Sequence, residues 1–274
     1  MSCPIGVFDS GYGGLTILKD IVKEMPGYDY IYLGDNARTP YGTRSFDVVY
    51  EYTRQAVLKL FEMNCRLVIL ACNTASAKAL RTIQQVDLPL IDPERRVLGV
   101  IRPSVEAVSR FTTNGHIGVL GTKGTVASGS YLMEIAKIHS EKGLRVTQQA
   151  CPMWVPLVEN DEIDTPGTNY FVRKYVQELM GKDPMIDTII LACTHYPLLR
   201  EKIDEIVPEG VTVVEQGGLV ARSLKDYLRR HPEIDGRLSK EGKIIYYTTE
   251  KGGMFDRMAA LFLQADVTSR HIEI

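Results

Sequence analysis

Two cysteines in similar surroundings are the residues of this chain best suited to chemistry. Each ends a short apolar run; Cys72 is followed by an Asn-Thr pair and Cys193 by a Thr-His pair. Such a run is typical of a strand buried on both faces of a parallel sheet. α/β proteins bind ligands at the carboxyl ends of these strands. Two thiols at matching points of two matching units can act on opposite faces of one small molecule, which predicts a proton-transfer enzyme with two thiol bases.

A single free cysteine is more often a small buried hydrophobe than a reactive group. The residues after Cys72 and Cys193 argue otherwise, because they supply side-chain donors, an acid/base group at His195 and the free N–H groups of an expected helix start. Packing alone does not require these features twice. The remaining cysteines have no donor-rich neighbours and are interpreted as structural; they are Cys3, Cys65 and Cys151.

Composition narrows the class of protein. The 274 residues include 32 Lys and Arg and 34 Asp and Glu, a net charge of −2, without a long basic run, so no nucleic-acid partner is expected. No apolar stretch approaches the roughly 20 residues of a membrane span, and no signal-peptide core precedes the first apolar run. We therefore expect a cytoplasmic protein without a membrane partner. Five cysteines at irregular spacing predict neither disulfides nor a zinc site.

Short apolar runs alternate with longer segments of helical spacing, such as Val48–Met63, and this alternation indicates an α/β fold. The runs expected to form strands are Ile5–Phe8, Tyr30–Leu33, Leu67–Leu70, Val97–Ile101, Ile117–Leu120, Leu144–Val146, Thr188–Leu191, Val211–Val214 and Ile244–Tyr247.

A weak internal repeat predicts two similar lobes, each a mainly parallel sheet flanked by helices, with the active site in the cleft between them. Junctions are expected near Gly99 and Gly210. The first lobe then comprises residues 1–98 plus 211–274 and carries one cysteine motif, and the second comprises 99–210 and carries the other. The strand-like runs after Gly210 are too few for a third domain and are expected to complete the first sheet.

A glycine-rich turn, Asp9–Gly14, follows the first expected strand. A dinucleotide fingerprint needs glycine where Thr16 stands, and a phosphate loop needs a Gly-Lys-Ser/Thr motif, so neither NAD nor ATP is expected. Glycines here let the backbone approach a ligand closely, and Ser10 can hold a carboxylate at a helix start. A helix cap by Asp9 or Ser10 explains the same residues, and the sequence leaves both interpretations open.

Three further segments are candidates. The irregular polar loop Gly34–Thr43 either binds a ligand or is a plain turn. The hydroxyl-rich Gly121–Thr125 occupies the matching place in the second lobe, where a threonine could equally cap a helix. Glu159 is either a functional carboxylate or a solvated charge.

Taken together, these motifs resemble those of the cofactor-independent aspartate and glutamate racemases, and of glutamate racemase in particular. Aspartate racemases typically carry Cys-Thr-Glu at the second cysteine, so Cys193-Thr194-His195 favours glutamate. The resemblance covers most of the chain and rests on Ile5–Leu15, Gly34–Thr43, Ala71–Ser76, Cys151–Glu159 and Cys193–Pro197.

The resemblance implies that Cys72 and Cys193 exchange the α-proton of glutamate without a cofactor or metal, with Asp9 and His195 assisting the thiols. By family analogy Cys193 takes the proton from L-glutamate and Cys72 takes it from D-glutamate. The D-glutamate produced is expected to serve peptidoglycan synthesis. The implied partner is the small-molecule substrate, and a homodimer is left open. The implied substrate contacts are Asp9, Ser10, Tyr41, Gly42, Asn73, Thr74, Thr122, Thr125, Thr194 and His195.

The chain departs from the family pattern at Arg102–Ser104, where the family often has Glu-Pro-Gly, at Glu215–Gly217, where it has an acidic small-residue motif, and at the apparent insertion Asp92–Arg96. These departures leave regulation and lobe packing open. Alternatives are a racemase for aspartate or another acidic amino acid, or a related isomerase or decarboxylase. A two-lobed binding protein would need no thiols, and a cysteine hydrolase would leave Cys72 unexplained.

Overall fold

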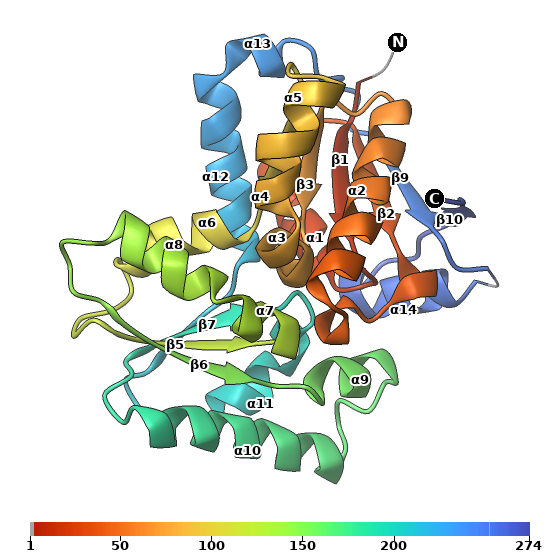
Figure 1. Ribbon diagram of the computed structural model, residues 1–274. Coiled ribbons are helices and arrows are strands. Elements are labelled where there is room, and N and C mark those ends of the chain that lie inside the picture. The colour runs from red at the N-terminus through yellow and green to blue at the C-terminus, as the bar shows by residue number, and fades with distance from the viewer. Residues whose placement is uncertain (1–2, 252) are drawn as a thin grey trace.

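Ten strands form two separate parallel sheets, one in each lobe, in the computed structural model, which describes residues 3–251 and 253–274 (Figure 1). The first sheet has the order β10-β9-β2-β1-β3-β4, with β1 Ile5–Asp9, β2 Tyr30–Gly34, β3 Leu67–Leu70, β4 Arg96–Gly99, β9 Ile244–Thr248 and β10 Ser269–His271. The second has the order β6-β5-β7-β8, with β5 His116–Gly121, β6 Arg145–Ala150, β7 Thr188–Ala192 and β8 Thr212–Val214. The expected two-lobed α/β fold is confirmed.

Helices cover both faces of each sheet, which is why the central strands are apolar throughout. On the first sheet, one face is covered by α1 Gly14–Glu24, α12 Gly217–Arg230 and α14 Met254–Leu263, and the other by α2 Phe46–Glu62 and α3 Asn73–Lys78. On the second, α6 Ile101–Val108 and α8 Ser130–Ile138 lie opposite α9 Trp154–Glu159, α10 Pro166–Lys182 and α11 Arg200–Asp204.

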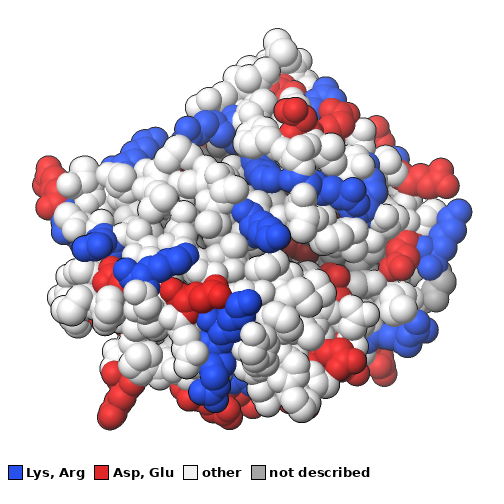
Figure 2. Space-filling model, turned by 60° about the horizontal axis from the view of Figure 1, so that its bottom comes forward, with Lys and Arg blue, Asp and Glu red and all other residues white. Residues whose placement is uncertain are grey.

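The shorter helices lie in the connections: α4 Leu80–Thr82, α5 Leu88–Ile91, α7 Lys123–Ser128, α13 Pro232–Asp235, the 3₁₀ turns η1 Asn36–Arg38, η2 Tyr41–Thr43 and η4 Tyr196–Leu199, and the π-helical η3 Ile83–Asp87. None of the helices described has both the length and the apolar composition needed to cross a bilayer. Acidic and basic side chains are interspersed over the face drawn in Figure 2, in keeping with the small net charge.

The chain crosses between the lobes twice. The first crossing follows β4, close to the expected junction at Gly99. The second differs from expectation, because β8 pairs with β7, with Thr212 beside Thr188. The expectation that Val211–Val214 joins the first sheet is therefore wrong, and the chain returns only after Val214. Residue composition indicates that a segment forms a strand but not which sheet it joins. Strands that follow one another in the sequence usually lie side by side, as β7 and β8 do.

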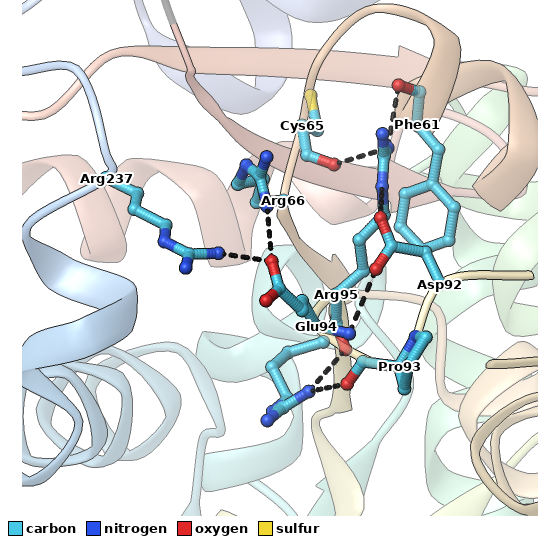
Figure 3. Close-up of polar contacts among 9 residues, drawn as sticks. Phe61, Cys65, Arg66, Asp92, Pro93, Glu94, Arg95 and Arg237 are labelled. Carbon is cyan, nitrogen blue, oxygen red and sulfur yellow. Dashed lines mark hydrogen bonds and ion pairs between the residues drawn. The ribbon is translucent and has the colours of Figure 1, made fainter. Parts of the chain in front are cut away.

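The apparent insertion Asp92–Arg96 leads into the edge strand β4, which begins at Arg96, and Figure 3 shows its polar contacts. Glu94 forms ion pairs with two arginines: its Oε2 lies 3.4 Å from Nη1 of Arg66 and 2.7 Å from Nη1 of Arg237. Arg95 donates to two main-chain carbonyls at and just beyond the end of α2, at 2.7 and 3.2 Å. A guanidinium complements the negative end of a helix. The segment thus ties α2 and the connection after α13 to the sheet at the start of β3, the opposite end of that strand from Cys72.

Candidate active site

The two cysteine motifs meet at one cavity between the lobes. The cavity encloses about 80 Å³, so it accommodates a small molecule. Ten of the residues expected at the site line it: Ser10, Tyr41, Gly42, Cys72, Asn73, Thr74, Thr122, Cys193, Thr194 and His195. The other two expected residues, Asp9 and Thr125, are fully buried behind this lining.

Cys72 follows β3 and caps α3, with its Sγ accepting from the N–H of Ala75 at 3.4 Å. The hydroxyl of Ser10 lies 3.4 Å from the same sulfur. Burial raises the pKa of Cys72 to about 12; the charge of Asp9 adds to the rise, whereas the bonds from Ser10 and Ala75 oppose it. Cys72 therefore rests as a neutral thiol. Because Ser10 reaches the sulfur while α1 has no side-chain cap, the helix-cap interpretation of Ser10 is wrong.

Cys193 follows β7 and has a different polar environment. Its Sγ lies 3.9 Å from Nδ1 of His195, whose Nε2 lies 2.9 Å from Oε1 of Glu159. Burial lowers the pKa of His195, but hydrogen bonds and charges from Cys193 and Glu159 outweigh it and raise the pKa to about 10. The imidazole is thus charged at neutral pH and lies beside the sulfur of Cys193. Glu159, which the sequence left open, therefore belongs to the site.

Asp9 ends β1 beneath the cavity. Its Oδ2 accepts from the N–H of Gly11 at 2.9 Å, and its Oδ1 has no hydrogen-bond partner in the part of the chain that the structure describes. Burial raises the pKa of Asp9, and the charge of His195 acts in the opposite direction. Its place is behind the thiols, where its charge acts on Cys72.

Threonine hydroxyls from both lobes meet on one wall of the cavity. Thr122 caps α7 by accepting from the N–H of Thr125 at 3.1 Å, so the helix-cap interpretation of this segment is correct. Thr74 of the first lobe lies 3.0 Å from the hydroxyl of Thr122 and 3.3 Å from that of Thr125. Thr122 therefore both caps the helix and faces the cavity.

The loop between β2 and α2 is organised by the buried carboxylate of Asp35. Arg38 Nε donates to it at 2.6 Å, Thr249 Oγ1 at 2.9 Å, and the hydroxyl of Tyr41 donates to it as well. Because that hydroxyl is engaged, Tyr41 contributes mainly its ring to the cavity, beside Gly42. The loop is thus a built wall of the site and not a plain turn.

Glycines allow the lobes to approach across the site. A Cβ added to Gly13 would lie 2.3 Å from Thr194 Oγ1 and 2.4 Å from His195 Nδ1. One added to Gly42 would lie 2.9 Å from the Cβ of Thr122. Thr16 of α1 also donates to the carbonyl of Thr194 at 3.0 Å. The backbone of the first lobe therefore packs directly on the second cysteine motif.

Comparison with known proteins agrees with this geometry. Residues 5–224 match the family model described as Asp/Glu/Hydantoin racemase. The chain belongs to this family. It is 38% identical over 260 residues to the glutamate racemase of Geobacter metallireducens, covering 94% of this chain and 92% of that one. It is also 38% identical over 272 residues to the glutamate racemase of Persephonella marina, covering 98% and 97%.

Solved structures of glutamate racemases share the fold of this Asp/Glu/Hydantoin racemase family member. An isoform from Bacillus anthracis superposes with a TM-score of 0.89 at 32% identity, covering 99% of this chain and 98% of that chain. The glutamate racemase from Francisella tularensis, solved in complex with D-glutamate, superposes with a TM-score of 0.86 at 29% identity, with the same coverage of both chains.

Sequence reasoning missed part of the lining of this racemase-family cavity. The sequence predicts a structural role for Cys151, which is buried at the cavity wall, and the resemblance of Cys151–Glu159 to the family is the signal for its place there. Lys123 adds a positive charge at the start of α7. Eight lining residues are not singled out individually by the sequence, although all lie in the segments Gly34–Thr43, Gly121–Thr125 or Cys151–Glu159; they are Thr39, Pro40, Thr43, Lys123, Cys151, Pro152, Val155 and Pro156.

Proposed function

We propose that this chain is an isomerase that interconverts L- and D-glutamate without a cofactor, by proton transfer between Cys72 and Cys193, and that it supplies D-glutamate for peptidoglycan. The observation that carries the proposal is the pair of thiols from two lobes at one small cavity, one beside a charged histidine and the other held neutral by burial. Relatives named glutamate racemases, similar over nearly the whole chain, support the substrate.

In the direction from L-glutamate, the thiolate of Cys193 takes the α-proton, so the C–H bond breaks and an S–H bond forms. The neutral thiol of Cys72 gives its proton to the opposite face of the α-carbon and becomes the thiolate. The reverse direction exchanges the two roles. His195, held by Glu159, stabilises the Cys193 thiolate, and the charge of Asp9 keeps Cys72 protonated until the transfer.

The α-proton of an amino acid is very weakly acidic, so placed donors must stabilise the carbanion. Ser10, Thr74, Thr122 and Thr194 line the cavity from both lobes, and their hydroxyls are proposed to hold the two carboxylates. Excluding water strengthens these donors, which gives the close packing at Gly13 a catalytic purpose.

Circular dichroism of the purified protein with L- or D-glutamate tests the proposal. After dialysis against a chelator, and with no pyridoxal phosphate added, the optical signal of either enantiomer should decay to that of the racemate. A requirement for pyridoxal phosphate or a divalent ion would contradict the two-thiol mechanism. Faster turnover of L-aspartate than of L-glutamate would contradict the substrate.

A further inference from the structure

One glutamine side chain bridges the two crossings between the lobes. Gln216 precedes α12 in the second crossing and is 3% exposed. Its Nε2 donates to Ser104 Oγ at 2.8 Å and lies 3.3 Å from the carbonyl oxygen of Val100, both at the first crossing. Segments more than 100 positions apart in the sequence are thus joined by a single amide. Two of the three segments in which the sequence departs from the racemase pattern, Arg102–Ser104 and Glu215–Gly217, meet at this bond.

The same amide closes a ring of hydrogen bonds that reaches the residue after Cys72. Gln216 Nε2 donates to the hydroxyl of Tyr131 at 2.8 Å, which donates to Asn73 Oδ1 at 2.7 Å, and Asn73 Nδ2 donates back to Gln216 Oε1 at 2.6 Å. Tyr131 belongs to α8 of the second lobe and Asn73 to α3 of the first. All three side chains are buried.

The chemistry of this ring requires an amide at position 216. The side chain must donate to Ser104 and Tyr131 and at the same time accept from Asn73. A carboxylate of the same size can only accept, and an aliphatic side chain can do neither. Buried polar groups that lose their partners destabilise the arrangement in which they lie. The ring therefore favours one relative position of the lobes over all others.

We propose that Gln216 is a positioning residue that fixes the two lobes relative to each other and, through Asn73, places Cys72 against Cys193. As a part of catalysis this inference rests on the proposed racemase activity. Proton transfer between opposite faces needs both sulfurs in reach of one α-carbon, so a small rotation of a lobe impairs turnover more than binding. The carboxamide of Asn73 makes two of the bonds in the ring, and these bonds hold the residue next to Cys72 in place.

The test compares Gln216→Leu and Gln216→Glu with Gln149→Leu. Gln149 is also a buried glutamine, but its partners all lie in the second lobe: Ala150 at 2.9 Å, Glu178 at 2.7 Å and Lys182 at 2.6 Å. Each variant is measured for melting temperature, for kcat and KM in both directions, and for alkylation rates of Cys72 and Cys65 by mass spectrometry. Ser104→Ala, which removes one partner only, serves as a milder variant should the others fold poorly.

Both Gln216 variants should lose about tenfold or more in kcat with a much smaller change in KM, since positioning and not uniform binding is lost. Alkylation of Cys72 should accelerate because the lobes separate more readily, while that of Cys65, buried in the core of the first lobe between α2 and β3, should not change. Gln149→Leu should lower the melting temperature without either effect.

Two results would overturn the inference: unchanged alkylation of Cys72 in the Gln216 variants, or an equal loss of kcat in Gln149→Leu at equal melting temperature. The alkylation arm does not depend on turnover. If the wild-type protein fails to racemise glutamate, that arm alone decides whether Gln216 holds the lobes, so failure of the proposed function and failure of this inference are distinguishable.

Discussion

Replacing Gly13 with alanine tests whether the lobes meet as closely as the structure shows. Gly13 has φ −58° and ψ −33°, a conformation that alanine adopts freely, so the substitution adds a methyl group without backbone strain. That methyl carbon would lie 2.3 Å from Thr194 Oγ1 and 2.4 Å from His195 Nδ1, whereas ordinary contacts begin at 3.4 Å. The effect is therefore steric and falls on the residues beside Cys193.

Relief of the overlap requires a displacement of about 1 Å, the amount by which these distances fall short of ordinary contact. Rotation of His195 away from the methyl group is unfavourable, because its Nε2 lies 2.9 Å from Oε1 of Glu159. The ring of Phe262 also packs edge-to-face with that of His195, with 5.6 Å between the ring centroids. The second lobe must shift instead. A misplacement of about 1 Å costs on the order of 10²-fold in rate, which corresponds to about 3 kcal/mol in the barrier.

The assay is kcat and KM for both enantiomers together with thermal melting. Gly181→Ala is the matched control, because Gly181 lies inside α10 with no neighbouring atom within 4 Å of the added carbon. That variant should keep full activity and gain about 0.5–1 kcal/mol, as alanine does over glycine in a helix. Activity of Gly13→Ala within a factor of two of wild type would refute the close packing inferred here.

Three further outcomes are expected. Cys72→Ser and Cys193→Ser should each abolish racemisation. Each variant should still eliminate a β-leaving group from one enantiomer of a glutamate analogue, and the two variants should prefer opposite enantiomers, because the remaining thiolate reaches only one face. The same preference in both variants would argue against one base per face. The pKa of His195 is raised to about 10 in the folded protein, against about 6.5 in the unfolded chain. The charged histidine therefore stabilises the fold fully below pH 6.5, and this stabilisation is lost as the pH rises through 10. Glu159→Gln should accordingly lower the melting temperature most below pH 6.5 and least above pH 10. Glu94→Gln should leave the urea midpoint of unfolding nearly unchanged and leave kcat unchanged, since both ion pairs of Glu94 are solvent-exposed; a change in kcat would connect this edge of the sheet to the site.

The strand ends and the turns after them were predictable because their signals are local. The run before Cys72 and that before Cys193 are apolar over their whole length, and the polar residues that follow start helices or turns. Such patterns depend on neighbours in the chain, and the observed strands β1, β3 and β7 begin where the sequence predicts.

Sheet membership and long-range contacts were not predictable in the same way. The run at Val211–Val214 looks equally suited to either sheet, and its pairing with β7 is decided by which edge lies within reach. The short strand Ser269–His271 escaped notice because it is exposed and lacks an apolar pattern. Glu159 carries no local feature that distinguishes it from a solvated charge, and only the folded chain brings it to His195.

The amino-acid sequence alone indicates that two thiols follow two buried strands in matching halves, because strand formation and the polar residues after it are properties of short segments. The difference between the two thiols arises only in the folded chain. Cys72 is neutral because helices and Asp9 enclose it, and Cys193 has a charged partner because Glu159 reaches His195 from 36 positions earlier. The burial of a group and the charges around it depend on residues that are distant in the sequence, so both are fixed only when the two lobes pack together.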